Sequence, residues 1–350
     1  MRVVKTPGIS VAVVRGNEIL YSNGFGWANI EDGQLATRDT AYQLASISKT
    51  MTCAGIMTLW EDGLIDLDAN INEYLPFEVH IPHAPNVPIT MRQILTHTSA
   101  IADRYSVWGT PYSDPTLYFH GDSPITLGDF EHSYMVPGGT EYQEKANFYE
   151  RSPGVRYAYS NLAVALAGYV AEVVSGIDFD TLCRQRIMEP LGMTDSGYRL
   201  ADLTTTNLAM PYDVDAHGNF APIFLYGYPD YPDGALRTSA VHLARWLGAF
   251  MNYGRFQGAR VLQRNTVKEI RRNQIPDIVT WPQGLIWYGD SIGPYTVYGH
   301  NGGDYGESTE MFFRPDRGVG VIALTNSYIP YGKRWTSFQD IEVRLYQEFS

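Results

Sequence analysis

A serine and a lysine stand three residues apart in the segment "YQLASISKTMTC", where an extended stretch gives way to a helical pattern. If Ser46 begins the helix, Lys49 lies one turn later on the same face, so the two side chains can meet. A serine hydroxyl becomes an effective nucleophile when a nearby base takes its proton, and a partly desolvated lysine or a phenolate can do so. The pair therefore indicates acyl transfer through Ser46, although S-x-x-K also arises by chance and serine is common at helix starts.

A second candidate is the segment "RYAYSNLAVALAGY", in which Tyr159 and Asn161 come directly before an apolar helix. A phenol at this point can relay protons, and the Asn161 amide can hold Lys49 or a substrate carbonyl by hydrogen bonds. The alternative is structural, with Ser160 or Asn161 capping the helix and Tyr159 filling the core.

A third candidate is "YGHNGG" at the end of a strand, with His300, Asn301, Gly302 and Gly303. Glycines there let backbone N–H groups approach a ligand closely, as an oxyanion hole requires, and His300 can bond a polar group of a substrate. Taken alone, this segment is typical of a turn.

The three motifs in this order resemble those of the serine β-lactamase and penicillin-recognising family. The resemblance is to its class C-like branch, which includes D-alanyl-D-alanine carboxypeptidases, D-aminopeptidases and family VIII esterases. That family carries S-x-x-K, then Y-x-N, then K-T-G or H-x-G, and here these are Ser46 to Lys49, Tyr159 to Asn161 and His300 to Gly302. Connecting segments such as "TPGISVAVV" and "RIMEPLGMTDSGY" are similar too, so the resemblance covers most of the chain.

The resemblance implies that Ser46 is acylated while Lys49 and Tyr159 share the general-base and general-acid roles, without assigning the first proton transfer to either. Backbone N–H groups of Ser46 and Gly303 would form the oxyanion hole. Asn161 would orient Lys49 or the acyl group of the substrate, and His300 would also support the Tyr159 hydroxyl. No metal or organic cofactor is implied. The substrate-binding residues would be Asn161, His300, Asn301 and Gly302.

One departure from the family pattern concerns the substrate. His300 stands where most class C β-lactamases have lysine, and histidine is largely neutral at pH 7. A β-lactam carboxylate therefore lacks a permanent cationic partner, which favours hydrolysis of esters or of D-amino-acid amides and peptides over β-lactamase activity.

Other motifs give weaker support for a functional site. His80 and His83 in "HIPH" lack further metal ligands, and "DLDANINE" lacks the glycine and glutamate of a calcium loop. No G-x-S-x-G elbow is present, which counts against an α/β-hydrolase. His97 in "LTHTS" is expected to be structural, because the local sequence supplies no catalytic partner.

The elements around these motifs predict the fold. Alternating apolar residues predict strands near both chain ends, and helical periodicity predominates between them. We expect an α/β (α+β) fold in which an antiparallel sheet is flanked by helices and interrupted by a helical insertion. The sheet region would be residues 1–45 and 235–350, and the helical region 46–234. Within it, the aromatic segment 101–150, with Trp108 and Tyr112, is expected to be a loop that selects the substrate.

Composition limits the partners. The chain has 350 residues, 44% of them hydrophobic and 18% charged, and a formal net charge of −12. The negative charge disfavours nucleic acid and anionic membranes, so a neutral or cationic small molecule fits better. No stretch is long and apolar enough for a membrane span, and the sequence as written has no export signal. These two observations predict a cytoplasmic protein. If an N-terminal segment has been removed, the prediction becomes periplasmic or secreted. Cys53 and Cys183 are expected to be buried free thiols.

The sequence therefore predicts a serine acyl-hydrolase for small esters, amides or D-amino-acid peptides. A β-lactamase or a transacylase of the same family is an alternative, and so is a penicillin-binding sensor that is acylated but not released. The number of product molecules released per protein distinguishes the sensor from the enzymes.

Overall fold

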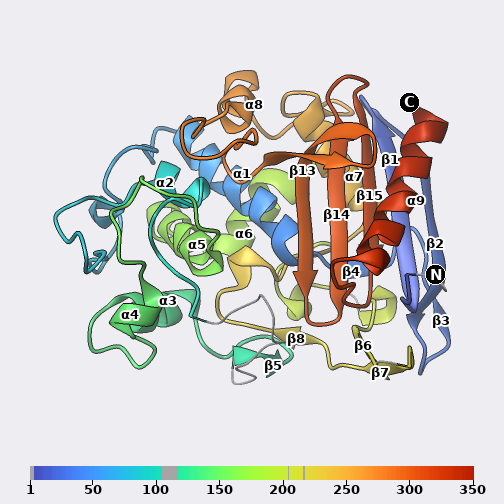
Figure 1. Cartoon of the computed structure of the whole chain (residues 1–350), viewed down its shortest axis with the longest axis horizontal. Coiled ribbons are helices and arrows are strands. Elements are labelled where there is room, and N and C mark those ends of the chain that lie inside the picture. Colours follow the sequence, from blue (N-terminus) through green and yellow to red (C-terminus); the bar gives the residue numbers. More distant parts are fainter. Residues whose placement is uncertain (1–3, 105–116, 204, 216) are drawn as a thin grey trace.

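Strands from both ends of the chain form one seven-stranded antiparallel sheet in the computed structural model, which describes residues 4–104, 117–203, 205–215 and 217–350 (Figure 1). The strands of this sheet are β1 (Gly8–Arg15), β2 (Glu18–Asn29), β3 (Gln34–Leu35), β12 (Tyr288–Ile292), β13 (Tyr295–Asp304), β14 (Glu307–Arg314) and β15 (Val319–Thr325). Their order is β12-β13-β14-β15-β1-β2-β3, so the N-terminal hairpin joins the C-terminal strands through the β1–β15 pair. The remaining described strands form pairs, which are β4 (Ala41–Gln43) with β9 (Arg237–Ser239), β5 (Phe119–His120) with β8 (Tyr226–Gly227), β6 (Tyr212–Val214) with β7 (Phe220–Pro222), and β10 (Arg255–Phe256) with β11 (Ala259–Arg260).

Helices cover the sheet and form a second region beside it (Figure 1). They are α1 (Ser48–Glu61), α2 (Met91–Leu95), α3 (Leu127–Met135), α4 (Glu144–Asn147), α5 (Asn161–Ser175), α6 (Phe179–Cys183), α7 (Ala240–Met251), α8 (Arg264–Arg271) and α9 (Lys333–Phe349). α7 and α9 pack against the sheet, whereas α1, α5 and α6 pack against one another next to it. The architecture confirms the predicted fold class, with helices inserted between the N- and C-terminal strands of one sheet.

Strand β1 shows why the two faces of the sheet are both covered. All of its residues except the last are buried. Ala12 and Val14 belong to the large core that includes α7, whereas Ile9 and Val11 pack with Phe338 of α9. Because successive strand residues point to opposite faces, an apolar run of this kind requires a helix on each side.

Helix α1 lies in the middle of the helical region and is enclosed on every side. Residues 48–59 are all buried, so the helix has no solvent-exposed face over this length. A Cβ atom at Gly55 would lie 2.9 Å from the Cys183 sulfur, which shows how closely α1 and the α6 segment approach. Cys53 and Cys183 are buried free thiols, as predicted.

The aromatic segment 101–150 is more regular than expected. Its described part contains β5, α3 and α4, and a Thr126 side chain caps α3 by accepting the Asp129 N–H. Trp108 and Tyr112 lie outside the described residues, so their contact with substrate stays a prediction. The expectation of a wholly irregular loop was therefore wrong for residues 127–135 and 144–147.

Among the described residues, no single helix has the length and apolar composition to cross a membrane. Asn161–Ser175 and Phe179–Met188 pass that test only as a pair, with a bend of 80° between them. Gly176 makes this bend in the left-handed region at φ 72°, and its N–H donates to the Glu172 carbonyl.

Glu131 on α3 predicts an unusual pH dependence of stability. Its side chain is fully buried and neither carboxyl oxygen has a hydrogen-bond partner among the described residues. Burial, with Asp230 and Asp233 nearby, raises the pKa of Glu131 well above its ordinary value. The folded state thus keeps a proton that the unfolded chain releases above its own pKa, and the free energy of unfolding falls as pH rises beyond that point.

We therefore expect Glu131→Gln to be close to neutral for stability at pH 4, and to stabilise the protein relative to wild type at pH 8. Urea unfolding of both proteins at the two pH values measures how the difference in their free energies of unfolding changes with pH. An equal effect at pH 4 and pH 8 would contradict the assignment of a buried, protonated Glu131.

Candidate active site

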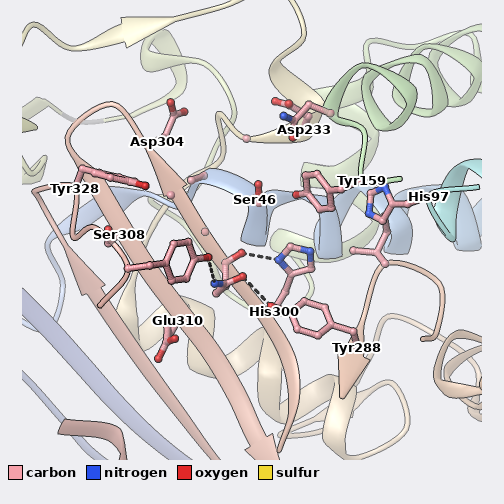
Figure 2. A pocket seen from close by; sticks show the side chains of 18 of the residues that line it. Ser46, His97, Tyr159, Asp233, Tyr288, His300, Asp304, Ser308, Glu310 and Tyr328 are labelled. Carbon is pink, nitrogen blue, oxygen red and sulfur yellow. Dashed lines mark hydrogen bonds between the residues drawn. The ribbon is translucent and has the colours of Figure 1, made fainter. Parts of the chain in front are cut away.

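Ser46 lies on a sharp bend between β4 and α1. Ala45 adopts φ 48°, in the left-handed region that alanine rarely occupies. A 3-10 turn over Ala45–Ile47 follows, and α1 itself begins at Ser48, so Ser46 precedes the helix rather than starting it. Backbone strain of this kind persists only where surrounding structure holds it, and here it presents the Ser46 side chain to a pocket (Figure 2).

Lys49 reaches Ser46 from the buried side, as the spacing predicted. Its Nζ atom donates to Ser46 Oγ over 3.0 Å and to the Asp233 carbonyl oxygen over 2.8 Å. The Asp233 carboxylate lies 3.9 Å from the same Nζ atom, and the Lys49 side chain is almost completely buried. The lysine therefore bridges the nucleophile candidate and the loop before β9.

The charge of Lys49 is balanced by its neighbours. Burial by itself lowers the pKa of Lys49, but the nearby Tyr159 hydroxyl and the Asp233 carboxylate outweigh this, and the pKa is raised. Burial raises the pKa of Tyr159 as well, although Lys49 and Ser46 partly oppose the rise. Both groups accordingly hold their protons at neutral pH in the ligand-free site, and they titrate as a coupled pair.

Tyr159 faces this pair from the residue before the α5 cap. Its Oη atom is buried beside the Ser46 and Lys49 side chains, and Lys49 Nζ lies 5.1 Å from the ring centroid. Ser160 caps α5 by accepting the Ala163 N–H over 3.0 Å and donating to Asp103 over 2.9 Å. The structural alternative therefore holds for Ser160, whereas Tyr159 lines the pocket instead of filling the core.

Asn161 is the first residue of α5 and also lines the pocket. Its backbone N–H donates to Asp103 over 2.8 Å. No hydrogen bond among the described residues joins its side chain to Lys49, whose partners are Ser46 and Asp233. The predicted role of Asn161 in binding substrate is untested, but in this structure the residue does not orient Lys49.

His97 is a pocket residue that sequence reasoning treated as structural. Its Nδ1 atom accepts the Ser160 N–H over 3.3 Å, and its ring packs against the Tyr159 ring with centroids 4.3 Å apart (Figure 2). Burial lowers the pKa of His97 well below its ordinary value, so the ring is neutral and carries its proton on Nε2. These partners lie about sixty positions away in the chain, which is why the local sequence gave no signal for them.

His300 on β13 is neutral, in agreement with the expectation for this position. Its Nδ1–H donates to the Asn301 carbonyl oxygen over 2.6 Å, which leaves Nε2 as a free acceptor. Burial, with a smaller contribution from Lys49, lowers the pKa of His300 to about 3. The side-chain oxygen of Asn301 accepts a hydrogen bond from Tyr288 Oη over 2.7 Å (Figure 2).

The glycines of β13 bring the strand against the Ser46 turn. A Cβ atom at Gly302 would lie 2.4 Å from the Leu44 carbonyl oxygen and 2.9 Å from the Ser46 backbone nitrogen. A side chain at this position is therefore excluded by the close approach of two backbones. Gly303 lines the same pocket as Ser46, and their joint role as an oxyanion hole stays a prediction.

These residues surround one cavity of about 570 Å³. It is lined by Ser46, Tyr159, Asn161, His300, Asn301, Gly302 and Gly303, whereas Lys49 lies behind Ser46. Asp304 lies at one wall, where it accepts from Gln43 over 2.8 Å and from Tyr118 and Tyr228 over 3.1 Å. The part of the chain described here contains no group of three His, Cys, Asp or Glu side chains arranged to hold a metal ion.

Comparison with known proteins relates most of the chain to one family. A family model described as Beta-lactamase matches residues 2–337. Protein flp of Staphylococcus aureus (strain NCTC 8325 / PS 47) is 22% identical over 329 residues, which cover 93% of this chain and 61% of the relative. The chain thus spans less than two thirds of the length of this curated relative.

Two solved structures share the fold. D-amino acid amidase from Ochrobactrum anthropi SV3, complexed with L-phenylalanine amide, has a TM-score of 0.75 at 20% identity, covering 98% of this chain and 95% of its own. EstCE1, described as a hydrolase with promiscuous acyltransferase activity, has a TM-score of 0.72 at 21% identity, covering 97% of this chain and 94% of its own. At such identities the likeness concerns the fold.

The Tyr159 hydroxyl gives a test that separates chemistry from stability. Because Oη is buried and interacts only with the Ser46 and Lys49 side chains, Tyr159→Phe should change the melting temperature little. If the hydroxyl transfers protons, the acylation rate of an ester should fall by roughly 10²–10⁴-fold. Single-turnover kinetics and thermal melts measure the two effects. A rate change below about threefold would remove Tyr159 from the proton relay.

Proposed function

Because the chain belongs to the beta-lactamase family, we propose that it is a serine acyl-hydrolase that acts on small esters or amides through a Ser46 acyl-enzyme. The observation that carries this proposal is the 3.0 Å hydrogen bond between Lys49 Nζ and Ser46 Oγ at the wall of the pocket. A buried lysine held against a serine hydroxyl has no packing role that a smaller apolar residue would not fill better.

In the proposed acylation step, Ser46 Oγ attacks the substrate carbonyl carbon and its proton passes to the Lys49–Tyr159 pair. The carbonyl π electrons move to the oxygen, which backbone N–H groups of Ser46 and Gly303 would stabilise. Collapse of this intermediate breaks the bond to the alcohol or amine, and the pair returns a proton to that leaving group. Water then attacks the acyl-enzyme by the same sequence and restores Ser46.

The resting protonation of the pair has a consequence for this step. A Lys49 ammonium that donates to Ser46 Oγ cannot also accept the Ser46 proton, and a neutral phenol at Tyr159 is no better as a base. The reactive form of the enzyme is therefore the one in which the pair has lost one proton. Its fraction increases as pH rises toward the raised pKa values of Lys49 and Tyr159.

The pocket favours some acyl substrates over others. His300 is neutral and cannot balance a carboxylate, and carboxyl groups of Asp230, Asp233 and Asp304 line the wall. These features support esters or amides without an anionic group rather than β-lactams. The D-amino acid amidase and the promiscuous hydrolase among the structural neighbours are compatible with either bond type.

Replacement of the nucleophile tests the proposal directly. We expect the wild type to release p-nitrophenol continuously from a short-chain p-nitrophenyl ester, and Ser46→Ala to reduce release to the uncatalysed background. Ser48→Ala is the matched control, because Ser48 Oγ accepts the buried Leu236 N–H over 3.1 Å and faces no reaction. This control should lose about 1 kcal/mol of stability and keep its turnover. A burst near one equivalent in the wild type would instead indicate a sensor, and turnover by Ser46→Ala would refute the nucleophile.

The pH profile tests the proton relay. For a neutral ester, kcat/KM corrected for spontaneous hydrolysis should rise with pH from 6 to 9, by at most about tenfold per unit, as the pair loses its proton. Burial, with Asp103 and Asp304 nearby, raises the pKa of Asp230 to about 7, so a separate inflection at that pH should disappear in Asp230→Asn. A profile that is flat in both proteins would contradict the coupled relay.

A further inference from the structure

The charges that line the pocket are of one sign. Its carboxylate residues are Asp230, Asp233, Asp290, Asp304 and Glu310, and no lysine or arginine is among the described residues of its wall. Lys49 lies behind Ser46 with its charge directed to Asp233. Burial raises the pKa of Asp230, Asp233 and Glu310, so these carboxyl groups hold protons more readily than usual, but the described wall has no positive side chain to attract an anion.

Glu310 stands out among these carboxyl groups because it is deeply buried and receives a single amide N–H bond. It lies on β14 and is 1% exposed, and only its Oε1 atom has a partner, the Gln339 amide at 3.1 Å. Among the described residues, Glu310 Oε2 and both carboxyl oxygens of fully buried Glu342 on α9 have no N–H or hydroxyl donor, and the two carboxyl groups interact with each other. Buried carboxyl oxygens are rarely left in this state, since each unpaired polar group costs free energy.

A shared proton accounts for part of this arrangement. Burial raises the pKa of both Glu310 and Glu342, and each carboxyl group interacts with the other. One proton between the two groups leaves a single negative charge at the wall of the pocket. Gln339 satisfies one oxygen of the pair, so acceptor capacity remains for a further donor.

Aromatic rings complete this part of the wall. Tyr331 and Trp335 line the pocket with ring centroids 4.9 Å apart, and Tyr331 is 56% exposed. The faces of such rings attract cations. Gly303 pairs with Ser308, which precedes Glu310 by two residues on β14, so these two positions add little or no side chain to the wall. Figure 2 shows Ser308 and Glu310 on this strand.

We propose that Glu310, with Gln339, Tyr331 and Trp335, binds an ammonium group of the substrate. The inference rests on the proposed acyl transfer at Ser46 and narrows its substrates to esters or amides that carry a primary or secondary amine. Glu310 receives one N–H bond, from Gln339, so an N–H group of the ligand can add a second, which a quaternary ammonium group cannot supply. A metal ion is disfavoured, since the described residues offer two carboxylates here and no third.

The test measures binding without turnover. In the Ser46→Ala protein, titration calorimetry compares hexylammonium, 1-hexanol and hexanoate, which share one alkyl chain and differ in charge. We expect hexylammonium to bind at least about tenfold more tightly than 1-hexanol, and hexanoate to bind most weakly. In Ser46→Ala/Glu310→Gln, the affinity for hexylammonium should fall by about tenfold while that for 1-hexanol changes little.

Two control substitutions define the site. Glu342→Gln leaves the charge on Glu310, so hexylammonium binding should persist. Glu348→Gln removes an exposed charge from the same helix, and binding should not change. An equal loss in Glu348→Gln and Glu310→Gln would overturn the inference, because binding would then depend on net charge alone. Equal affinity of the Ser46→Ala protein for hexylammonium and 1-hexanol would overturn it without any Glu310 variant.

Further outcomes distinguish the ammonium site from a metal site and from the proposed acyl-hydrolase activity. Stabilisation by millimolar Mg²⁺ or Ca²⁺ that disappears in Glu310→Gln would overturn the ammonium assignment in favour of a metal ion. Absence of Ser46-dependent ester turnover would refute the proposed function, whereas the calorimetric comparison would still report on Glu310. Turnover of neutral esters together with no preference for hexylammonium would refute the ammonium site alone.

Discussion

The buried ammonium group of Lys49 is the constraint on which the rest of the site depends. A cation in this position must be compensated, and the compensation comes from the Asp233 carbonyl and carboxylate and from the Ser46 hydroxyl. These partners belong to a loop before β9 and to a turn after β4, and β4 and β9 pair with each other. The charge therefore ties together two segments that lie almost two hundred residues apart.

The second requirement is close contact between the sheet and the helical region. β13 approaches the Ser46 turn at Gly302, and the Thr309 hydroxyl of β14 donates to the Leu44 carbonyl oxygen over 2.7 Å. The sheet thus fixes the strained turn at Ala45, which has no stabilising side-chain cap of its own. The same contact places the neutral His300 across the pocket from Tyr159, so a residue from each half of the molecule faces the nucleophile candidate.

The pocket also shows how electrostatics selects among related chemistries. Position 300 holds a neutral histidine rather than a permanent cation, and the pocket wall has several carboxyl groups. Both features disfavour an anionic ligand. The Glu310–Glu342 pair extends this pattern to the α9 side of the wall. One fold can therefore keep the same nucleophile arrangement and differ in its substrates through a few charges at the wall.

The sequence by itself determined the fold class, the spacing that joins Ser46 to Lys49, and the motifs that carry Tyr159 and His300, whose joint role only the family resemblance implied. These features are local, because helical spacing, strand alternation and short motifs are written within a few residues. It did not reveal Asp233 as the partner of Lys49, His97 as the neighbour of Tyr159, or the opposing carboxyl groups of Glu310 and Glu342. Those contacts join segments remote in the chain, and their strength depends on burial, which arises only when the sheet and helices pack together. Tertiary structure therefore decided which groups are charged, which remain unpaired, and what the pocket can hold.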